Sequence, residues 1–236
     1  MPRRPRITFD GAIHHVYTTG VRHSHIYLTP DDRSAFSCTL AEVCRRSGWQ
    51  IYSDCQMGTH YHLLLLTPRA NLPYGMQFLN SAYAVRFNRL HEVEGHLFKG
   101  RYGSRLVTTD SYALELIRYI ALNPVRSGLV DRPEDWRWGS YRALVGLDPA
   151  ESYLSTSWVL EQFHESPAHA RRSLTEFVRM GLDMDDLSRP SLGRLLSDDS
   201  PASIRRARDV CGYTLQAIAD HLGISVTTVW RRSQRR

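Results

Sequence analysis

The stretch THYHLLLL, residues 59–66, places two histidines at alternate positions and then runs into four leucines. Gly58 precedes it at a turn, and we expect a β-strand over residues 60–67. Side chains two positions apart on a strand point to the same face of the sheet. The sequence therefore predicts a strand on which His60 and His62 lie side by side.

The residues on either side of this strand alternate between strand and helix patterns. Thr29 and Pro30 predict an N-cap and a first helical residue. Strands are expected at 13–19, 49–57, 60–67 and 104–108, and helices at 30–47, 72–93 and from 109 or 110 to about 123. The order β-α-β-β-α-β-α predicts an α+β fold, a ferredoxin-like sandwich with an antiparallel sheet. A helical C-terminal region that ends in a helix-turn-helix is expected to follow.

The bulk composition is that of a basic globular protein. The chain has 236 residues, is 42% hydrophobic and 23% charged, and carries a formal net charge of +6. An anionic partner, with nucleic acid as the first candidate, and a basic surface without a partner fit this charge about equally well.

The cysteines and the apolar runs indicate where the protein acts. None of the four cysteines forms a Cys-x-x-Cys pair, so a zinc ribbon or a redox motif is disfavoured. No apolar run exceeds four residues, which is too short to span a bilayer. The basic N-terminus has no apolar core of the kind found in signal peptides. We expect a cytoplasmic, nucleoid-associated protein with no membrane partner.

His60 and His62 are candidate metal ligands. Two imidazoles on one rigid strand face could bind a divalent ion, although a third ligand must come from elsewhere. The simpler interpretation is a pair of polar residues on the solvated face of an amphipathic strand.

A second candidate group lies near the end of the third predicted helix. Tyr119 and Asn123 are four residues apart and share a helix face. The phenol could attack a phosphodiester, and the amide oxygen could bind a metal. A buried core tyrosine with Asn123 as a helix-terminal residue before Pro124 is the alternative.

Several spaced motifs resemble one family. The residues His60-Tyr61-His62 resemble the His-hydrophobic-His motif of HUH single-strand DNA nucleases, and MGTHYHLLLL resembles a strand of the insertion-sequence tyrosine transposases. The motif YIALNPVRSGLV, with GRYGSRLV, WRWGSY and the opening GAIHHVYTTG, is similar to the REP-associated branch of these transposases. The resemblance covers about residues 7–146.

The resemblance implies roles for the matched positions. Tyr119 would be the nucleophile, and it would form a 5′-phosphotyrosine and release a 3′-hydroxyl. His60, His62 and Asn123 would bind Mg²⁺ or Mn²⁺. The substrate would be single-stranded DNA next to a hairpin, and the protein would act as a monomer or a homodimer.

Other residues could contact DNA or metal, each with a structural alternative. A backbone-binding groove is predicted from Arg86, Arg89, Lys99, Arg101, Arg105 and Arg126. Tyr102 and Trp138 could stack on unpaired bases, although core packing is the simpler interpretation of each. The histidines of the first strand and the segment after it could bind metal or phosphate, although core or surface positions near a sheet edge are expected. They are His14, His15, His23 and His25.

The C-terminal segment has helix-turn-helix spacing around Gly223, with Ser225 as the cap of the second helix. It resembles the DNA-binding domain of the bacterial replication initiator. The residues expected to reach DNA are Thr227, Thr228, Arg231 and Arg232.

The predicted domains are a catalytic domain at 1–146, a helical connector at 147–200 and a DNA-binding module at 201–236. A metal-dependent single-strand DNA endonuclease and strand transferase is the leading functional hypothesis. A DNA-binding regulator with a dormant nuclease fold is the main alternative.

Overall fold

The computed structural model describes residues 8–182, 192, 196, 198, 200–205, 207 and 215–233. The chain forms two compact units, residues 1–182 and 183–236. None of the helices in these described ranges combines the length and the apolar character needed to cross a membrane.

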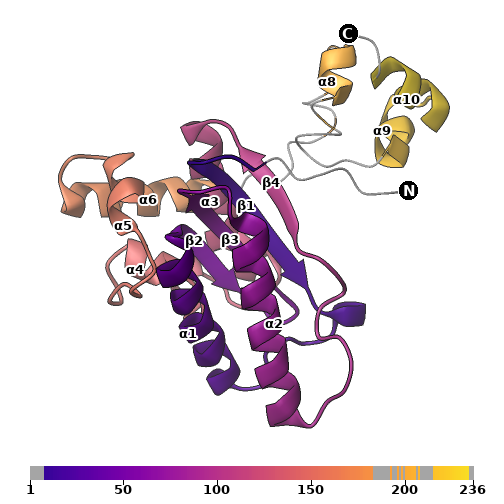
Figure 1. Ribbon diagram of the computed structural model, residues 1–236. Helices are drawn as coiled ribbons and strands as arrows, with labels where there is room; N and C mark the ends of the chain where they lie inside the picture. The colour runs from indigo at the N-terminus through magenta and orange to yellow at the C-terminus, as the bar shows by residue number, and fades with distance from the viewer. Residues whose placement is uncertain are drawn as a thin grey trace. The chain divides into compact units, whose positions relative to one another are not determined.

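Four antiparallel strands form the sheet of the first unit (Figure 1). They are β1 (Ala12–Thr19), β2 (Gln50–Gln56), β3 (His60–Thr67) and β4 (Gly103–Val107). Their spatial order is β2-β3-β1-β4, and all three neighbouring pairs are antiparallel. This order, with the interleaved helices, confirms the ferredoxin-like α+β fold.

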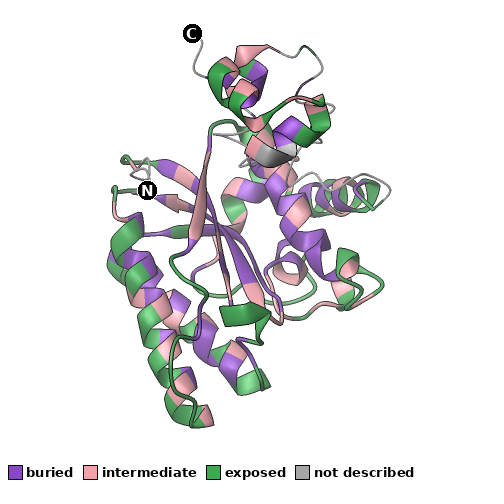
Figure 2. Ribbon diagram, turned by 90° about the vertical axis from the view of Figure 1, so that its right-hand side faces the viewer, coloured by how far each residue is buried: buried purple, intermediate pink, exposed green. Residues whose placement is uncertain are grey.

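The leucines of β3 are buried on both faces of the sheet. Leu63 and Leu65 pack in the core beneath α1 (Pro30–Ser47) and α2 (Leu72–His91), and Leu64 packs on the other face against α3 (Asp110–Arg126). Figure 2 shows this burial continuing along the strands. Each fully buried leucine contributes about 1.5–3 kcal/mol relative to an exposed one. The strand is therefore held firmly, and with it the two histidines at its start.

Helix α1 begins and ends where the sequence predicts. The Thr29 Oγ1 atom accepts a hydrogen bond from the Asp32 backbone N–H, and the Asp32 carboxylate accepts one from the Thr29 N–H. This reciprocal pair satisfies donors that the first helical turn leaves unpaired. Gly48 ends the helix with a φ of 73°, which glycine adopts without strain.

The predicted end of α3 near Asn123 and Pro124 is wrong, because the helix continues to Arg126. Proline lacks the N–H that would bond to the carbonyl four residues earlier. Here that loss falls in the last turn, and the Ser127 N–H still bonds to the Asn123 carbonyl. The chain therefore completes the turn, and Asn123 lies inside the helix.

Further helices pack beside α3 on the same face of the sheet. They are the 3-10 turn η2 (Pro133–Asp135) and the helices α4 (Tyr141–Leu144), α5 (Thr156–Glu161) and α6 (Pro167–Met180). A separate 3-10 turn, η1 (Val21–His23), follows β1. Side chains of α5 and α6, among them Val159, Leu174 and Val178, share a core cluster with α3. The compact units divide after Leu182, so this helical segment packs with the sheet. The predicted boundaries of the catalytic domain at residue 146 and of the helical connector at residue 200 stay predictions.

The second unit is helical. Its described helices are α8 (Pro201–Arg205), α9 (Leu215–Leu222) and α10 (Val226–Ser233), and Ile204, Ile218 and Val229 are buried among them. A three-residue turn joins α9 to α10, with Gly223 at a φ of 63°. The Ser225 Oγ atom accepts a hydrogen bond from the Thr228 N–H, as expected of an N-cap.

Candidate active site

One face of the sheet brings together side chains from β1, β3 and α3. His60 and His62 of β3 point to this face, as do Leu64 and Leu66 farther along the strand. Tyr119 of α3 lies over the strand, with its ring centroid 5.3 Å from that of His62 and nearly perpendicular to it. The predicted nucleophile and the two predicted histidine ligands therefore meet within one chain.

His15 of β1 completes the cluster. Its Nε2 atom lies 3.1 Å from His62 Nδ1, and the two rings are stacked with centroids 5.2 Å apart. The rings of His60 and His62 lie 5.1 Å apart, and the His60 Nδ1 atom is 3.1 Å from Thr59 Oγ1. Each of the two β3 imidazoles thus has its Nδ1 atom engaged by a neighbour.

Burial keeps these imidazoles neutral. It lowers the pKa of His15 to about 3, with a smaller contribution from the positive charge of Arg105. Burial, followed by His15, His60 and Arg105, holds the pKa of His62 well below its usual value. Burial, and then His23, also lowers the pKa of His60. A neutral imidazole with a free nitrogen is the form that binds a metal ion.

The residues present fit a divalent ion. In the tautomer in which His62 Nδ1 donates to His15, the lone pair of His62 Nε2 is left for a metal, and this arrangement is typical of metal-binding histidines. No group of three or more His, Cys, Asp or Glu side chains in the described ranges could hold an ion. A third protein ligand of another type is therefore needed.

Asn123 can supply that ligand. It lies one helical turn beyond Tyr119, on the same side of α3. The residue is buried, and its Nδ2 atom has no hydrogen-bond partner in the described part of the chain. The metal would be bound by the Asn123 Oδ1 atom, whereas the unpaired Nδ2 group is a donor that suits an acceptor such as a phosphate oxygen.

Tyr17 borders the cluster and depends on a glycine of the neighbouring strand. Its ring centroid lies 5.7 Å from that of His15 and 6.3 Å from that of His62. Gly103 faces Tyr17 across the sheet, and a Cβ atom at that position would lie 2.3 Å from the Tyr17 ring. The absence of a side chain at Gly103 thus allows the Tyr17 ring to lie flat across β4.

We expect Gly103→Ala to displace the Tyr17 ring toward the histidines and to lower the melting temperature. The clash is with Cζ, Cε2 and Oη at the outer end of the Tyr17 ring, so the ring must shift, and such overpacking costs about 1–3 kcal/mol. Thermal unfolding followed by circular dichroism measures the change. Gly100→Ala, where a Cβ atom would meet nothing within 4 Å, is the matched control. Equal melting temperatures for the two variants would contradict this account.

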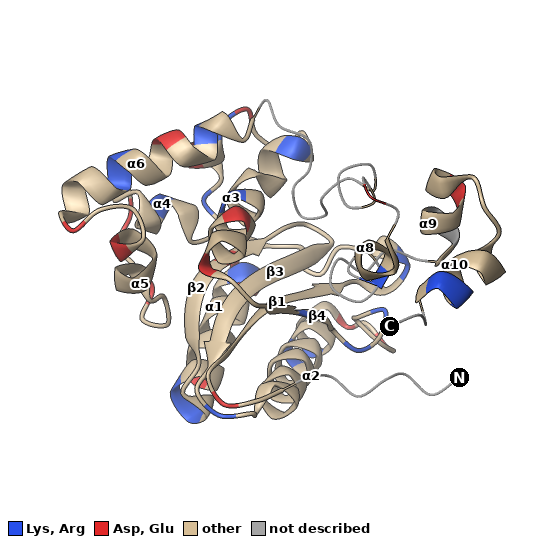
Figure 3. Cartoon of the chain, turned by 90° about the horizontal axis from the view of Figure 1, so that it is seen from above, with Lys and Arg blue, Asp and Glu red and all other residues tan. Residues whose placement is uncertain are grey.

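The basic residues predicted to bind DNA lie in different places, and Figure 3 shows Lys and Arg spread over several elements. Arg105 faces His15 across the β1–β4 pair, and the Lys99 backbone N–H bonds to Thr19, which is opposite His60. Arg101 is exposed in the loop between these two residues. These three positions border the histidine cluster.

The other three basic residues lie farther from the cluster. Arg86 and Arg89 are exposed on α2, which covers the opposite face of the sheet. Arg126 ends α3, where its Nη2 atom donates to the Gly181 carbonyl. The structure therefore does not bring Arg86 and Arg89 together with the histidines.

Sequence reasoning missed Tyr17 as a member of the site and favoured a core or surface position for His15 over metal or phosphate binding. His15 was expected to be a core or surface residue near a sheet edge, but β1 lies between β3 and β4 and has no free edge. The available signal was the alternation of Ile13, His15 and Tyr17, which places all three on one face of a strand. His14 points to the other face and is also buried, whereas His23 and His25 are exposed.

Comparisons with known proteins point to one family of transposases. The family described as IS200-like transposases matches residues 8–123. A Haemophilus influenzae protein described as a REP-associated tyrosine transposase is 24% identical over 126 residues, which cover 49% of this chain and 71% of that protein. A solved REP-associated tyrosine transposase, bound to a REP hairpin, shares the fold with a TM-score of 0.54 at 17% identity. The match covers 66% of this chain and 94% of that protein's chain. The chain thus contains, in residues 8–123, a domain of the IS200-like transposase family.

Proposed function

We propose that the protein is a metal-dependent single-strand DNA endonuclease and strand transferase that acts on DNA flanked by a hairpin. The position of the Tyr119 ring against His62, itself engaged by His15, is the observation that carries the proposal. The similarity to REP-associated transposases supports hairpin DNA as the substrate. A cytoplasmic, nucleoid-associated location follows from such a substrate.

In this mechanism, Tyr119 supplies the nucleophilic oxygen. A bond forms between Tyr119 Oη and the scissile phosphorus, and the bond from phosphorus to the 3′ oxygen breaks. The phenol loses its proton, and the departing oxygen gains one to become a 3′-hydroxyl. Attack of a 3′-hydroxyl on the phosphotyrosine reverses these changes and rejoins the strand, so no external energy source is needed.

His60, His62 and Asn123 would hold Mg²⁺ or Mn²⁺. A bound divalent ion polarises the phosphate and stabilises the charge that develops on it. The rigid pairing of β3 with β1 keeps the imidazoles oriented, because His15 fixes the ring of His62. Since all of these residues come from one chain, the arrangement supports a site that a monomer can form.

The test is incubation with labelled single-stranded hairpin oligonucleotides, taken from the DNA that flanks the protein's own gene, and analysis on a denaturing gel. A protein-linked DNA band should form with Mn²⁺ or Mg²⁺ and disappear with a chelator. Tight DNA binding without an adduct under either metal would instead support a dormant, DNA-binding regulator.

The C-terminal helices are proposed to add affinity for duplex DNA. Thr227 and Arg231 of α10 are exposed, and Thr228 and Arg232 are half-exposed on the same helix. The second helix of a helix-turn-helix places such residues against DNA.

We expect Arg231→Ala to weaken duplex DNA binding and to reduce the slope of log affinity against log salt by about 1, because one phosphate contact is lost. Fluorescence anisotropy at several salt concentrations measures this slope. Arg172→Ala, an exposed arginine of α6, is the control. An unchanged slope in Arg231→Ala would leave α10 without a role in duplex binding.

A further inference from the structure

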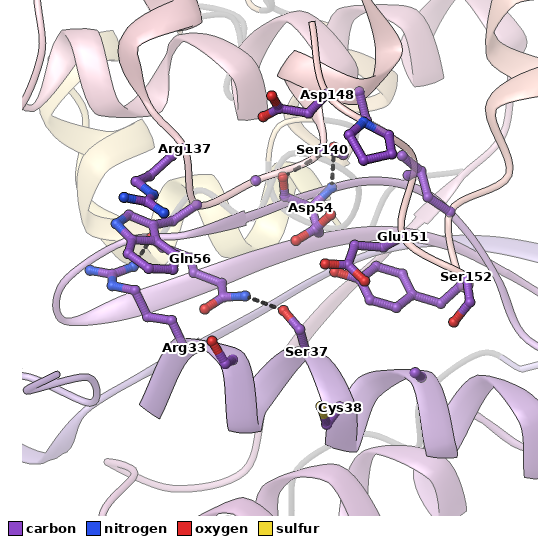
Figure 4. Close-up of a pocket in the computed structure, with 18 residues that line it drawn as sticks. Arg33, Ser37, Cys38, Asp54, Gln56, Arg137, Ser140, Asp148, Glu151 and Ser152 are labelled. Carbon is purple, nitrogen blue, oxygen red and sulfur yellow. Dashed lines mark hydrogen bonds between the residues drawn. The ribbon is translucent and has the colours of Figure 1, made fainter. Parts of the chain in front are cut away.

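A polar pocket, drawn in Figure 4, lies beside β2. Its volume is about 520 Å³, and residues of α1, β2 and the segment 137–154 line it. Asp54 and Gln56 pair with Leu63 and Tyr61 of β3, which face α1 and α2. The pocket therefore lies on the α1 side of the sheet, whereas Tyr119 lies on the other side.

One part of this pocket is cationic. The rings of Tyr27, Trp136 and Trp138 lie 4.7–5.4 Å from the Arg33 guanidinium, and Arg33 Nη1 donates to the Gln56 carbonyl. Burial lowers the pKa of Arg33, and no carboxylate of the described residues forms an ion pair with it. Because rings cover its faces, its remaining edge N–H groups suit an anionic ligand.

Another part of the pocket is rich in hydrogen-bond acceptors. The Asp54 carboxyl group lies beside that of Glu151 (Figure 4), and Asp54 is only 4% exposed. Burial, and then the charge of Glu151, raise the pKa of Asp54 to about 7. Gln56 is 3% exposed, and its Oε1 atom has no hydrogen-bond partner in the described part of the chain. The Gln56 Oε1 atom lacks a donor, and the neighbouring carboxyl oxygens can accept further hydrogen bonds, so this part of the pocket suits N–H donors of a ligand.

A divalent ion is a poorer fit than an organic ligand. Two adjacent carboxylates can attract a cation, but the described residues contain no group of three or more acidic, His or Cys side chains that could hold a metal. A cation would also leave Arg33 without an anion. A ligand that has a phosphate at one end and N–H donors at the other satisfies both parts of the pocket.

We propose that this pocket binds one unpaired nucleotide of the DNA substrate whose base carries an amino group. The phosphate lies toward Arg33 and the exposed Arg137, and the base presents its amino group to Asp54, Gln56 and Glu151. Thymine fits poorly, because it has no amino group and its single N3–H donor lies between two carbonyl oxygens that would face these acceptors. The assignment rests on the proposed action on single-stranded DNA.

The position of the pocket suits a strand that leaves the active site. Arg33 bonds to the Gln56 carbonyl, and the next residue, Met57, donates its N–H to the His60 carbonyl. The cationic part of the pocket is thus next to the turn that carries His60. A strand held at the metal site reaches the pocket by passing this turn.

The test uses the full chain carrying Tyr119→Phe, with a chelator present, so that binding is measured without cleavage. Isothermal titration calorimetry compares dAMP, dCMP, dGMP, dTMP and inorganic phosphate. At least one of the three amino-bearing nucleotides should bind about tenfold more tightly than dTMP or phosphate. Asp54→Asn and Arg33→Gln should each weaken that binding about tenfold.

Controls separate loss of binding from loss of folding. Glu151→Gln changes an exposed residue of the same pocket and should also weaken binding, with an unchanged melting temperature. Asp135→Asn and Arg172→Gln, exposed residues outside the pocket, should bind as the parent does. Equal binding of all four nucleotides and phosphate would overturn base recognition.

Two further results would also overturn the proposal. If Mn²⁺ bound to the parent protein and Asp54→Asn removed that binding, the pocket would be a cation site. If no nucleotide bound at millimolar concentration, the pocket would not be a nucleotide site. Neither result depends on adduct formation. A failed nuclease assay and a failed pocket assay are therefore distinguishable.

Discussion

Replacement of Tyr119 by phenylalanine is expected to abolish the covalent protein–DNA adduct and to leave DNA binding intact. The phenylalanine ring keeps the edge-on packing against His62 and His15, whose centroids lie 5.3 Å and 6.0 Å from that of Tyr119. Only the oxygen that would bond to phosphorus is removed. Since no other atom of the ring changes, the fold and the imidazole pair should be preserved.

Two assays on the same hairpin oligonucleotide separate the chemistry from binding. A denaturing gel measures the adduct, which should fall by about 10³-fold or more, because removal of a nucleophile eliminates the covalent route. A native gel shift measures affinity, which should change little. Tyr112→Phe is the matched control, since Tyr112 is a half-buried tyrosine two turns earlier in α3.

Either of two results would contradict the assignment. An adduct of normal yield in Tyr119→Phe would place the nucleophile elsewhere in the chain. Loss of DNA binding together with the adduct would indicate that Tyr119 is a packing residue of the core, the alternative that its spacing from Asn123 leaves open.

The parts of the fold that follow from local rules were predicted well. The bounds of α1 follow from Thr29, Pro30 and Gly48, and those of β3 from the turn at Gly58 and the apolar run. The strand order could be expected because the β-α-β-β-α-β pattern permits few ways of burying one sheet face under two helices. These signals lie within a few residues of each element.

The errors come from effects that are not local. The end of α3 was placed too early because Pro124 breaks a helix interior, whereas the structure uses it in a last turn that the Ser127–Asn123 hydrogen bond completes. His15 was not assigned to the site because its role depends on which strand lies beside β1. Only the register that places Tyr17 opposite His62 brings β1 and β3 side chains together.

The candidate site was predictable only where spacing along one element determines it. His60 with His62, and Tyr119 with Asn123, are each set by spacing along one element. The meeting of the two pairs depends on how α3 crosses the sheet. The predicted DNA-binding groove shows where sequence reasoning fails. Arg86 and Arg89 were grouped with the site, but they lie on α2, which covers the other face of the sheet.

Replacement of His62 by alanine is expected to remove metal binding and, with it, the adduct. His62 is the imidazole that His15 orients and that the Tyr119 ring contacts. Loss of a residue that merely orients a metal ligand costs about 10–100-fold in affinity, so loss of a ligand itself should cost about 100-fold or more. A chelator added to the parent protein should reproduce the loss of the adduct.

Calorimetric titration with Mn²⁺, without DNA, measures metal affinity directly. Because His62 is buried, the alanine variant could lose affinity through unfolding, so its melting temperature is measured in parallel. His60→Ala gives a second test at a half-exposed position. His169→Ala, which removes an exposed imidazole of α6, is the control and should bind Mn²⁺ as the parent does.

The comparison between the two histidine variants decides what the imidazole pair does. A metal site requires both rings, so His60→Ala and His62→Ala should each lose Mn²⁺ affinity. This is expected although His62 is buried, with the rings of His15 and Tyr119 beside it, and His60 is half-exposed. If His62 were only a packed core residue, its replacement would lower the melting temperature and leave Mn²⁺ binding unchanged. His60→Ala would then change neither quantity, since its ring is half-exposed and its Nδ1 atom is engaged by the adjacent Thr59.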